Sequence, residues 1–357
     1  MQNRRVIAWC LALLVAPGWI KAAELVLVAG GTRATLPCAA LEAKLDAPFG
    51  VDFNRQGTCF VVEMTGQRVL AISPTGELSL LAGTGEKGNS GDGGPPPAAR
   101  FNGMHSLVVA PSGEIYLADT WNHRVRKIDP QGKSIEAFAG TGTKGFSGDG
   151  GPARSAEFGG IYCLALDPPA SRMYLADLDN RRIRMIDLQS GVVTTIAGNG
   201  ASGEPADGAL AREAPLVDPR AVAADARGNV YILERKGDAL RVVDAAGKIR
   251  TLIGKSVAEL VDEEGRTPRP LKGPKHLSVD HDGNVLVADT ENHLIRKYIV
   301  GERRLVNIAG SGKGGNGGIG GSPLAAELKQ PHGVYEHASG EIFISDSSND
   351  RVVKIRP

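Results

Sequence analysis

Residues 102–140 read NGMHSLVVAPSGEIYLADTWNHRVRKIDPQGKSIEAFAG, and the pattern of this segment predicts the fold. It contains four short apolar runs separated by clusters rich in Pro, Gly, Asp, Asn and Ser. Short β-branched runs between such clusters predict strands joined by tight turns. Four antiparallel strands in a segment this short cannot bury both faces of their own sheet. The unit is therefore expected to stack against copies of itself.

The same pattern occurs six times along the chain, aligned on an acidic residue at the end of the second predicted strand. Successive acids are 56, 58, 57, 55 and 57 residues apart. This spacing predicts a tandem β repeat, and stacked repeats form one continuous body. The predicted units are 48–83, 103–140, 160–198, 219–254, 274–310 and 331–357, and their anchoring acids are Glu63, Asp119, Asp177, Glu234, Asp289 and Asp346.

The last unit ends after three predicted strands, and its missing outer strand has a counterpart at the other end of the chain. Residues 24–30, ELVLVAG, match outer-strand segments such as IEAFAG at 135–140. We expect this segment to pair with the last three strands and close a ring, since open sheet edges invite aggregation. The predicted fold is an all-β, six-bladed β-propeller with four-stranded antiparallel blades. An open solenoid is the alternative, and the circular offset counts against it.

The N-terminus has the pattern of a secretory signal peptide. MQNRR precedes an apolar run of about fifteen residues and then KAA, which predicts cleavage near residue 23 and a single domain over 24–357. An uncleaved membrane anchor is the alternative. Cleavage would remove three of the 41 basic side chains and none of the 40 acidic ones, changing the net charge from +1 to −2. The signal-like N-terminus predicts export to the periplasm or the exterior. The charge balance argues against nucleic-acid or membrane partners, and we expect a monomer.

Three cysteines follow the predicted cleavage site, and an odd number leaves at least one thiol unpaired. Cys59 is in the first unit and Cys38 shortly precedes it, so the two are a possible disulfide pair. Cys163 is in the third unit.

The units resemble the NHL repeat. The resemblance is clearest in PHGVYEHASGEIFISDSSNDRVVKI at 331–355 and PKHLSVDHDGNVLVADTENHLIRKY at 274–298, and it extends over 24–357. Units one and four depart from the motif, with Glu63 and Glu234 in place of Asp and Gly66 and Gly237 in place of Asn. The resemblance implies a β-propeller, and propellers host many unrelated activities.

Residues that recur in every unit are expected to be structural. Asx residues such as Asp119 and Asn122 satisfy the backbone of tight turns, and the Arg at 68, 124, 182 and 351 should pair with these turns or with neighbouring blades. The long connectors contain SGDGG turns at Asp92 and Asp149. These turns are either structural or able to cradle an ion.

Residues that differ between units are better candidates for a site. Fourteen residues before each acid, allowing for one inserted residue in unit three, the chain has Phe49, His105, Tyr162, Arg220, Lys275 and His332. These six side chains should surround one end of the central channel, and we call them the mouth ring. His276 is next to the ring, and His123 and His293 should lie on the same face. His281 and His337 should lie on the opposite face.

Two functions are compatible with such a ring. The first is a non-catalytic platform that binds a protein, a glycan or a small anion, with Arg220 and Lys275 holding the negative charge. The second is a metal-dependent lyase or hydrolase. The ring resembles that of the peptidyl-hydroxyglycine amidating lyase, which implies zinc, or another ion such as calcium, at His105 and His332. Tyr162 would then be the base. The position that should supply a third His is Arg220.

Overall fold

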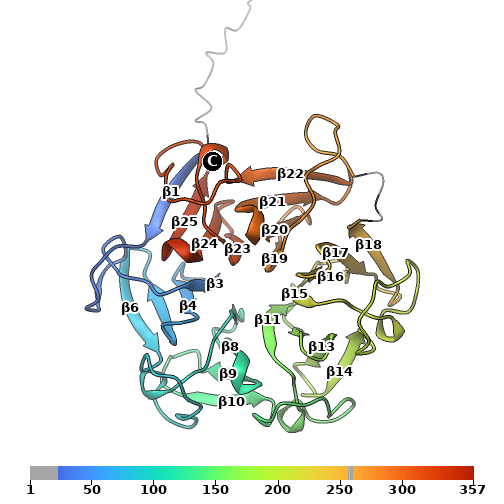
Figure 1. Ribbon diagram of the computed structural model, residues 1–357. Coiled ribbons are helices and arrows are strands. Elements are labelled where there is room, and N and C mark those ends of the chain that lie inside the picture. The colour runs from blue at the N-terminus through green and yellow to red at the C-terminus, as the bar shows by residue number, and fades with distance from the viewer. Residues whose placement is uncertain (1–22, 256, 258–259) are drawn as a thin grey trace, which may run out of the picture.

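Six antiparallel sheets are arranged around a central axis in the computed structural model, which describes residues 23–255, 257 and 260–357. The fold is the predicted six-bladed β-propeller (Figure 1). The predicted signal peptide lies almost wholly outside the described residues. No helix in the described part of the chain is both long and apolar enough to cross a membrane.

Each blade runs from an inner strand at the axis to an outer strand at the rim. The inner strands of the six blades, in chain order, are β3 (Pro48–Phe53), β7 (Ser106–Val109), β11 (Ile161–Leu166), β15 (Pro219–Ala224), β19 (His276–Val279) and β23 (Gly333–Glu336). The second strands are β4 (Cys59–Glu63), β8 (Ile115–Asp119), β12 (Arg172–Asp177), β16 (Val230–Glu234), β20 (Val285–Asp289) and β24 (Ile342–Asp346). The third strands are β5 (Arg68–Ile72), β9 (Arg124–Ile128), β13 (Arg182–Asp187), β17 (Ala239–Val243), β21 (Leu294–Ile299) and β25 (Arg351–Arg356). The outer strands are β6 (Glu77–Ala82), β10 (Ile135–Ala139), β14 (Val193–Ala197), β18 (Ile249–Ile253) and β22 (Arg304–Ala309), with β1 (Glu24–Ala29) in the last blade.

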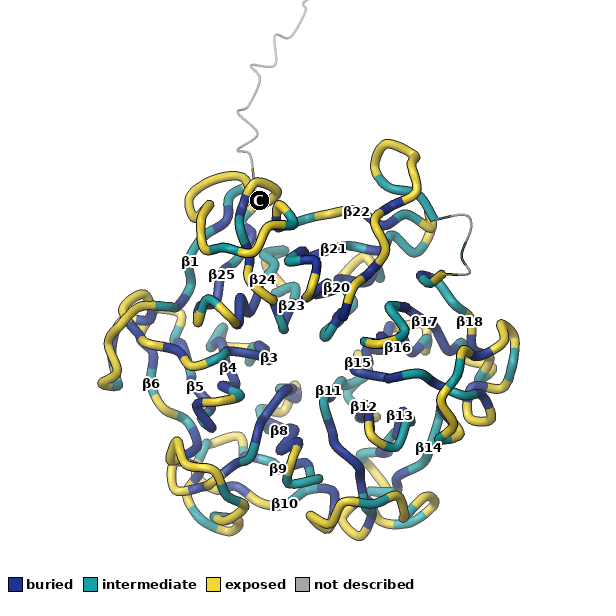
Figure 2. Tube along the Cα trace, viewed as in Figure 1, coloured by how far each residue is buried: buried dark blue, intermediate teal, exposed yellow. Residues whose placement is uncertain are grey.

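Seven short 3-10 helices occupy the turns and connectors of the described chain. Four are in the connectors, η1 (Pro96–Ala98), η3 (Ala153–Ser155), η4 (Ala211–Glu213) and η6 (Pro323–Ala325). Three are between second and third strands, η2 (Thr120–Asn122), η5 (Thr290–Asn292) and η7 (Ser347–Asn349). The inner three strands of each blade are mostly buried, whereas the outer strands and connectors are more exposed (Figure 2).

The N-terminal strand closes the ring, as the sequence predicted. β1 pairs antiparallel with β25, with Glu24 opposite Arg356 and Leu27 opposite Val353. Leu25 is fully buried in the core of the last blade, and its backbone also bonds to Gly320 and Gly321 of the preceding connector. Strands from the two ends of the described chain therefore form one blade.

The first blade departs from the prediction, because it has a fifth strand. β2 (Cys38–Ala39) pairs with the outer strand β6, giving the order β2-β6-β5-β4-β3. Cys38 and Cys59 are consequently three strands apart, roughly 14 Å at the usual strand spacing, which is too far for a disulfide. Both are buried free thiols, as is Cys163, so the suggested pair does not form.

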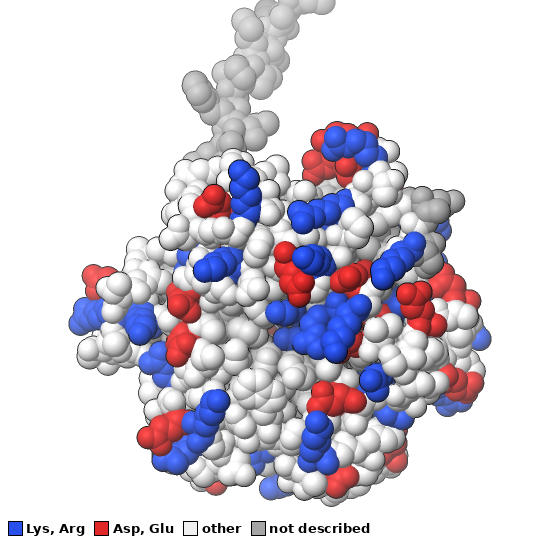
Figure 3. Space-filling view, in the orientation of Figure 1, with Lys and Arg blue, Asp and Glu red and all other residues white. Residues whose placement is uncertain are grey.

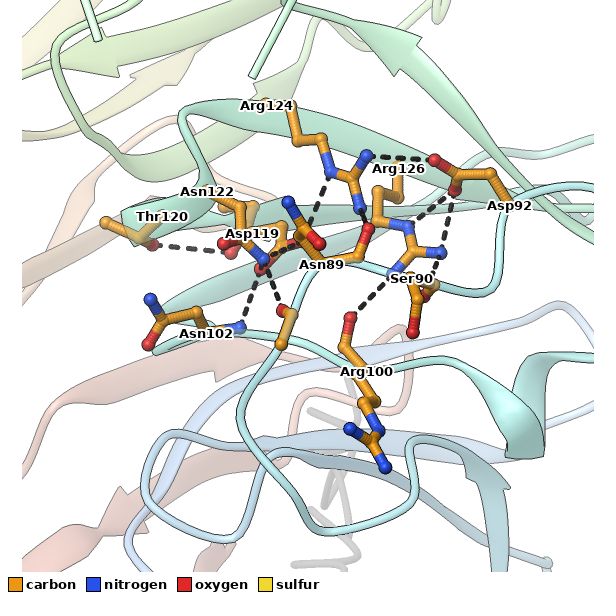
Figure 4. A network of polar contacts seen from close by, with 12 residues as sticks. Asn89, Ser90, Asp92, Arg100, Asn102, Asp119, Thr120, Asn122, Arg124 and Arg126 are labelled. Atoms are coloured by element: carbon orange, nitrogen blue, oxygen red, sulfur yellow. Dashed lines mark hydrogen bonds and ion pairs between the residues drawn. The ribbon is translucent and has the colours of Figure 1, made fainter. Parts of the chain in front are cut away.

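The six anchoring acids are structural, as expected. Each carboxylate accepts a hydrogen bond from a backbone N–H about 17 residues earlier, just before the inner strand of the same blade. In the second blade, Asn102 N–H donates to Asp119 at 2.9 Å, and Asn122 donates its amide to both carboxylate oxygens (Figure 4). These bonds fix the start of the inner strand relative to the end of the second strand.

The Glu–Gly departures in blades one and four have a steric cause. Glu is one methylene longer than Asp, so its carboxylate occupies the space that Asn fills in the other blades. A Cβ at Gly66 would lie 2.5 Å from Glu63 Oε2, and one at Gly237 would lie 2.8 Å from Glu234 Oε2. The longer acid therefore requires Gly three residues later, and the two positions change together.

The connector acids are also structural. Asp92 accepts bonds from Arg124 at 2.9 Å and Arg126 at 2.8 Å (Figure 4), and Asp149 binds Arg184 at 3.0 Å. In the last blade Ile319 stands where Asp92 stands in the second, and Val353 replaces the buried Arg126. The charged pair is thus exchanged as a unit for two apolar residues, and the SGDGG turns hold arginines of the same chain.

We predict that Leu25→Ala will lower the free energy of unfolding by about 2–5 kcal/mol, because it leaves a cavity in the closing blade. Val26→Ala, on the more exposed side of the same strand, should cost less than half as much. Urea unfolding of both variants measures the difference. Equal effects would show that β1 is not anchored through its buried face.

We also predict that Gly66→Asn will destabilise the protein by about 1–3 kcal/mol, since the new side chain meets Glu63. Adding Glu63→Asp to this variant should restore most of the loss by recreating the pair used in blades two, three, five and six. Thermal melts of the single and double variants provide the test. No recovery in the double variant would contradict the steric explanation.

Candidate functional site

The six mouth-ring residues converge at one end of the channel. Contacts link them in a continuous series that starts at Arg220, whose guanidinium lies 4.6 Å from the Tyr162 ring. Tyr162 contacts His105 edge-on, with ring centroids 4.6 Å apart, and His105 contacts Phe49 at 5.2 Å. Phe49 stacks on His332 at 4.1 Å, and His332 Nε2 lies 3.1 Å from Lys275 Nζ.

The ring is a packed layer rather than an open collar. Phe49, His105 and Arg220 are each at most 8% exposed, whereas Tyr162, Lys275 and His332 retain partial access to solvent. A ligand approaching this face would therefore first meet Tyr162, Lys275 and His332. The three more buried side chains pack beneath them.

Local backbone bonds orient the two ring histidines in the same way. His105 Nδ1 lies 2.7 Å from the carbonyl oxygen of Gly103, and His332 Nδ1 lies 2.7 Å from that of Gln330. A carbonyl only accepts, so each Nδ1 carries the proton and each Nε2 is left as an acceptor. Burial, reinforced by neighbouring cations, lowers the pKa of both imidazoles well below 6.5, so both are neutral near pH 7.

Positive charge accumulates at this end of the channel. Arg220 is almost fully buried, donates one bond to the Tyr162 carbonyl at 3.2 Å, and leaves its Nε without a partner. Burial lowers the pKa of Arg220 to about 10, and burial together with Arg220 and Arg235 lowers that of Lys275 to about 8. Figure 3 shows Lys and Arg side chains gathered near the centre of the face, on the side of β15 and β19.

Trp121 and Arg235 also lie on this face, but the sequence comparison used only the position fourteen residues before each anchoring acid and did not find them. Trp121 is 41% exposed, contacts His105 at 5.6 Å, and its indole N–H lies 3.4 Å from the Tyr162 hydroxyl. Arg235 pairs with Asp218 at 2.8 Å. Both follow an anchoring acid by one or two residues, where other units have Thr, Ser or varied side chains. Extending the comparison to those positions would have found them.

Arg235 occupies a position that other blades use for a link to the next blade. The hydroxyls of Thr120, Thr290 and Ser347 donate to a carbonyl of the following blade, at 2.7, 2.8 and 2.5 Å. The fourth blade has a cation there instead of this link. That substitution brings the guanidinium of Arg235, paired with Asp218, close enough to Arg220 and Lys275 to act on both electrostatically.

A cavity of about 230 Å³ lies along the channel among the inner strands. Asp52 and Tyr335 line it, and each stands eleven residues before its anchoring acid. Asp52 accepts bonds from the backbone N–H groups of Phe53 and Val109, and burial raises its pKa to about 6. Because Val109 belongs to the second blade, Asp52 links blades one and two.

His276, which the sequence placed next to the mouth ring, lines this cavity instead. Its Nδ1 accepts a bond from Val334 N–H in the last blade at 3.3 Å. Burial, with a contribution from Arg220, lowers the pKa of His276 to about 4.

The remaining histidines are in turns at the ends of the blades. His123 and His293 follow η2 and η5, and His293 Nδ1 accepts a bond from Gln330 N–H. His281 and His337 are in the turns after the inner strands β19 and β23, at the opposite ends of those strands from the mouth ring.

The residues present do not fit the metal site that the lyase resemblance implies. In the described part of the chain, no three His, Cys, Asp or Glu side chains gather in a way that could hold a metal ion. His332 directs the acceptor Nε2 to within 3.1 Å of the Lys275 amine, and Phe49 contacts both ring histidines. The third His position is Arg220, whose cation would repel a metal.

A family model described as NHL repeat matches residues 101–128 and 271–298, the first three strands of blades two and five. The chain is an NHL-repeat β-propeller. It is 24% identical to the NHL repeat-containing protein 2 of Gallus gallus over 85% of this chain and 46% of that protein. It is 26% identical to the Arabidopsis thaliana protein SUPPRESSOR OF QUENCHING 1, chloroplastic, over 76% of this chain and 26% of that protein.

Among solved structures, the propeller is similar to an auxiliary nutrient binding protein from Bacteroides thetaiotaomicron. The TM-score is 0.63 at 12% identity, with 94% of this chain and 76% of that chain covered. At this identity the similarity establishes the fold alone. The chain also spans less than half the length of the two curated relatives, so their activities do not transfer with the fold.

We predict that acid will destabilise the wild-type protein more than His276→Asn. The unfolded chain binds a proton at His276 near pH 6.5, but the folded protein does so only near pH 4. Neutral His276 therefore contributes fully to the free energy of unfolding above pH 6.5. This contribution is lost as the pH falls, because protonation of His276 then favours the unfolded chain. Between pH 7 and 5 it should fall by about 2 kcal/mol in the wild type.

The asparagine of the variant does not titrate, and Asp52 is present in both proteins, so the difference isolates His276. Urea unfolding at both pH values measures it. Parallel pH dependences would show that His276 titrates normally in the fold.

Proposed function

We propose that this NHL-repeat propeller is a binding module that holds a small anionic ligand at the mouth ring. The observation that carries the proposal is an excess of cations there. Buried Arg220 and partly buried Lys275 form no ion pair with any acid of the described residues, whereas the other buried arginines of the described chain do. A buried cation without an acidic partner is costly, and a bound anion would remove that cost.

The surroundings of the two cations support an organic rather than a purely inorganic anion. The Tyr162 ring lies 4.6 Å from the Arg220 guanidinium, and Trp121 extends this aromatic surface, with its indole N–H 3.4 Å from the Tyr162 hydroxyl. Lys87 Nζ lies 5.9 Å from the Trp121 ring. Aromatic faces bind flat apolar groups, while a Lys and an Arg hold a carboxylate or phosphate. A carboxylate attached to a planar or apolar group would match both the aromatic surface and the two cations.

A platform for a protein or glycan is the broader form of the same proposal. The similarity in fold to a nutrient binding protein is compatible with it, and the N-terminal signal-like pattern supports export to the periplasm or the exterior. The metal-dependent lyase is less well supported, because the ring lacks the donors that it needs.

The test uses benzoate as a probe and benzamide as its uncharged match. We expect benzoate to raise the melting temperature in proportion to its concentration and benzamide to have little effect. Lys275→Gln should weaken benzoate binding by about 10–100-fold in calorimetry, because it removes a charge-assisted hydrogen bond.

Lys144→Gln is the matched control, because Lys144 already pairs with Asp179 at 2.7 Å. It should leave binding unchanged. Equal affinity for benzoate and benzamide, or equal losses in the two variants, would overturn the proposal.

A further inference from the structure

Lys275 has an environment that no other lysine of the described chain shares. Its partner is a neutral imidazole, His332 Nε2 at 3.1 Å, whereas Lys127, Lys144, Lys297 and Lys354 each pair with a carboxylate. Because His332 Nδ1 is held as a donor by Gln330, its Nε2 lone pair points at the amine. The pair consists of an amine and a base in hydrogen-bonding contact.

The charged groups near Lys275 favour its free amine. Arg220 and Arg235 repel a proton on Nζ, and burial does so more strongly, while Glu291 alone opposes them. By contrast, the carboxylate of Asp179 raises the pKa of Lys144. With a pKa of about 8 in place of 10.5, Lys275 should have roughly 300 times more free amine near pH 7 than an ordinary lysine.

We propose that Lys275, with His332 as its proton acceptor, condenses reversibly with the carbonyl group of a small oxo acid and holds it as an imine. The proposal rests on the proposed anion site, since Arg220, the other cation of that site, would bind the carboxylate while Lys275 reacts with the carbonyl. Tyr162 and Trp121 would cover the rest of the ligand. The ligand class is therefore an aldehyde or ketone that also bears a carboxylate.

The reaction is balanced without any further reactant. His332 Nε2 takes a proton from the Lys275 ammonium, and the free amine attacks the carbonyl carbon to form a C–N bond. A proton moves from nitrogen to the former carbonyl oxygen. The imidazolium then returns its proton to this hydroxyl, and the C–O bond breaks to release water. The product is a protonated imine with the same net charge as the starting pair.

The experiment treats the full-length protein with glyoxylate and cyanoborohydride at pH 7.5 and locates the reduced adducts by peptide mass spectrometry. We expect Lys275 to be modified at least 10-fold faster than Lys144 in the same sample. Acetaldehyde, which lacks the carboxylate, should show a smaller preference for Lys275. His332→Gln should slow modification of Lys275 several-fold while leaving that of Lys144 unchanged.

Lys275→Arg separates this inference from the anion site. It keeps the charge, so benzoate should still bind, but the selective adduct should disappear. Modification of Lys275 no faster than Lys144 in a protein that binds benzoate would overturn the imine alone. If the wild-type protein neither bound benzoate nor was modified selectively at Lys275, the anion site would be overturned as well. Equal selectivity with acetaldehyde would show that no carboxylate is recognised.

Discussion

The pairing of β1 with β25 joins the two ends of the described chain and closes the ring of blades. A blade of three strands would expose an unpaired edge, and the first and last blades would be free to separate. With β1 in place, Phe49 of the first blade stacks on His332 of the last, and the series of mouth-ring contacts is continuous. The site is thus a consequence of closure, because no single blade supplies more than one residue of the ring.

Across the six blades, the repeated positions are structural and the variable positions form the candidate site. The anchoring acids satisfy backbone N–H groups in every blade, and compensating changes preserve the arrangement where the acid is longer, as at Glu63 with Gly66. The mouth-ring position, fourteen residues before each anchoring acid, does not bond to the backbone in this repeated way. It carries an aromatic, imidazole or cationic side chain in each blade, and the chemistry of the mouth resides there.

Electrostatics follow from the same division. Acids of the second blade are already bonded within that blade and its connector: buried Asp119 accepts a bond from Asn102 N–H, and the more exposed Asp92 pairs with Arg124 (Figure 4). No acid of the described residues pairs with Arg220 or Lys275, so a chain of nearly balanced charge has a local excess of cations at one end of its channel. Burial and this excess of cations together lower the pKa values of His105, His332 and Lys275.

The period of the repeats, the order of the strands, the closing segment and the convergence of six positions on one axis were all determined by the sequence itself. These features follow from local periodicity and from symmetry, so one unit predicts the others. Only the tertiary structure decided which side chains touch across blades. It put Cys38 on a fifth strand at the rim, directed His332 at Lys275 instead of at a metal, and brought Trp121 and Asp52 to the axis. Such contacts depend on side-chain direction and on neighbours about 57 residues away, and a pattern within one repeat contains neither.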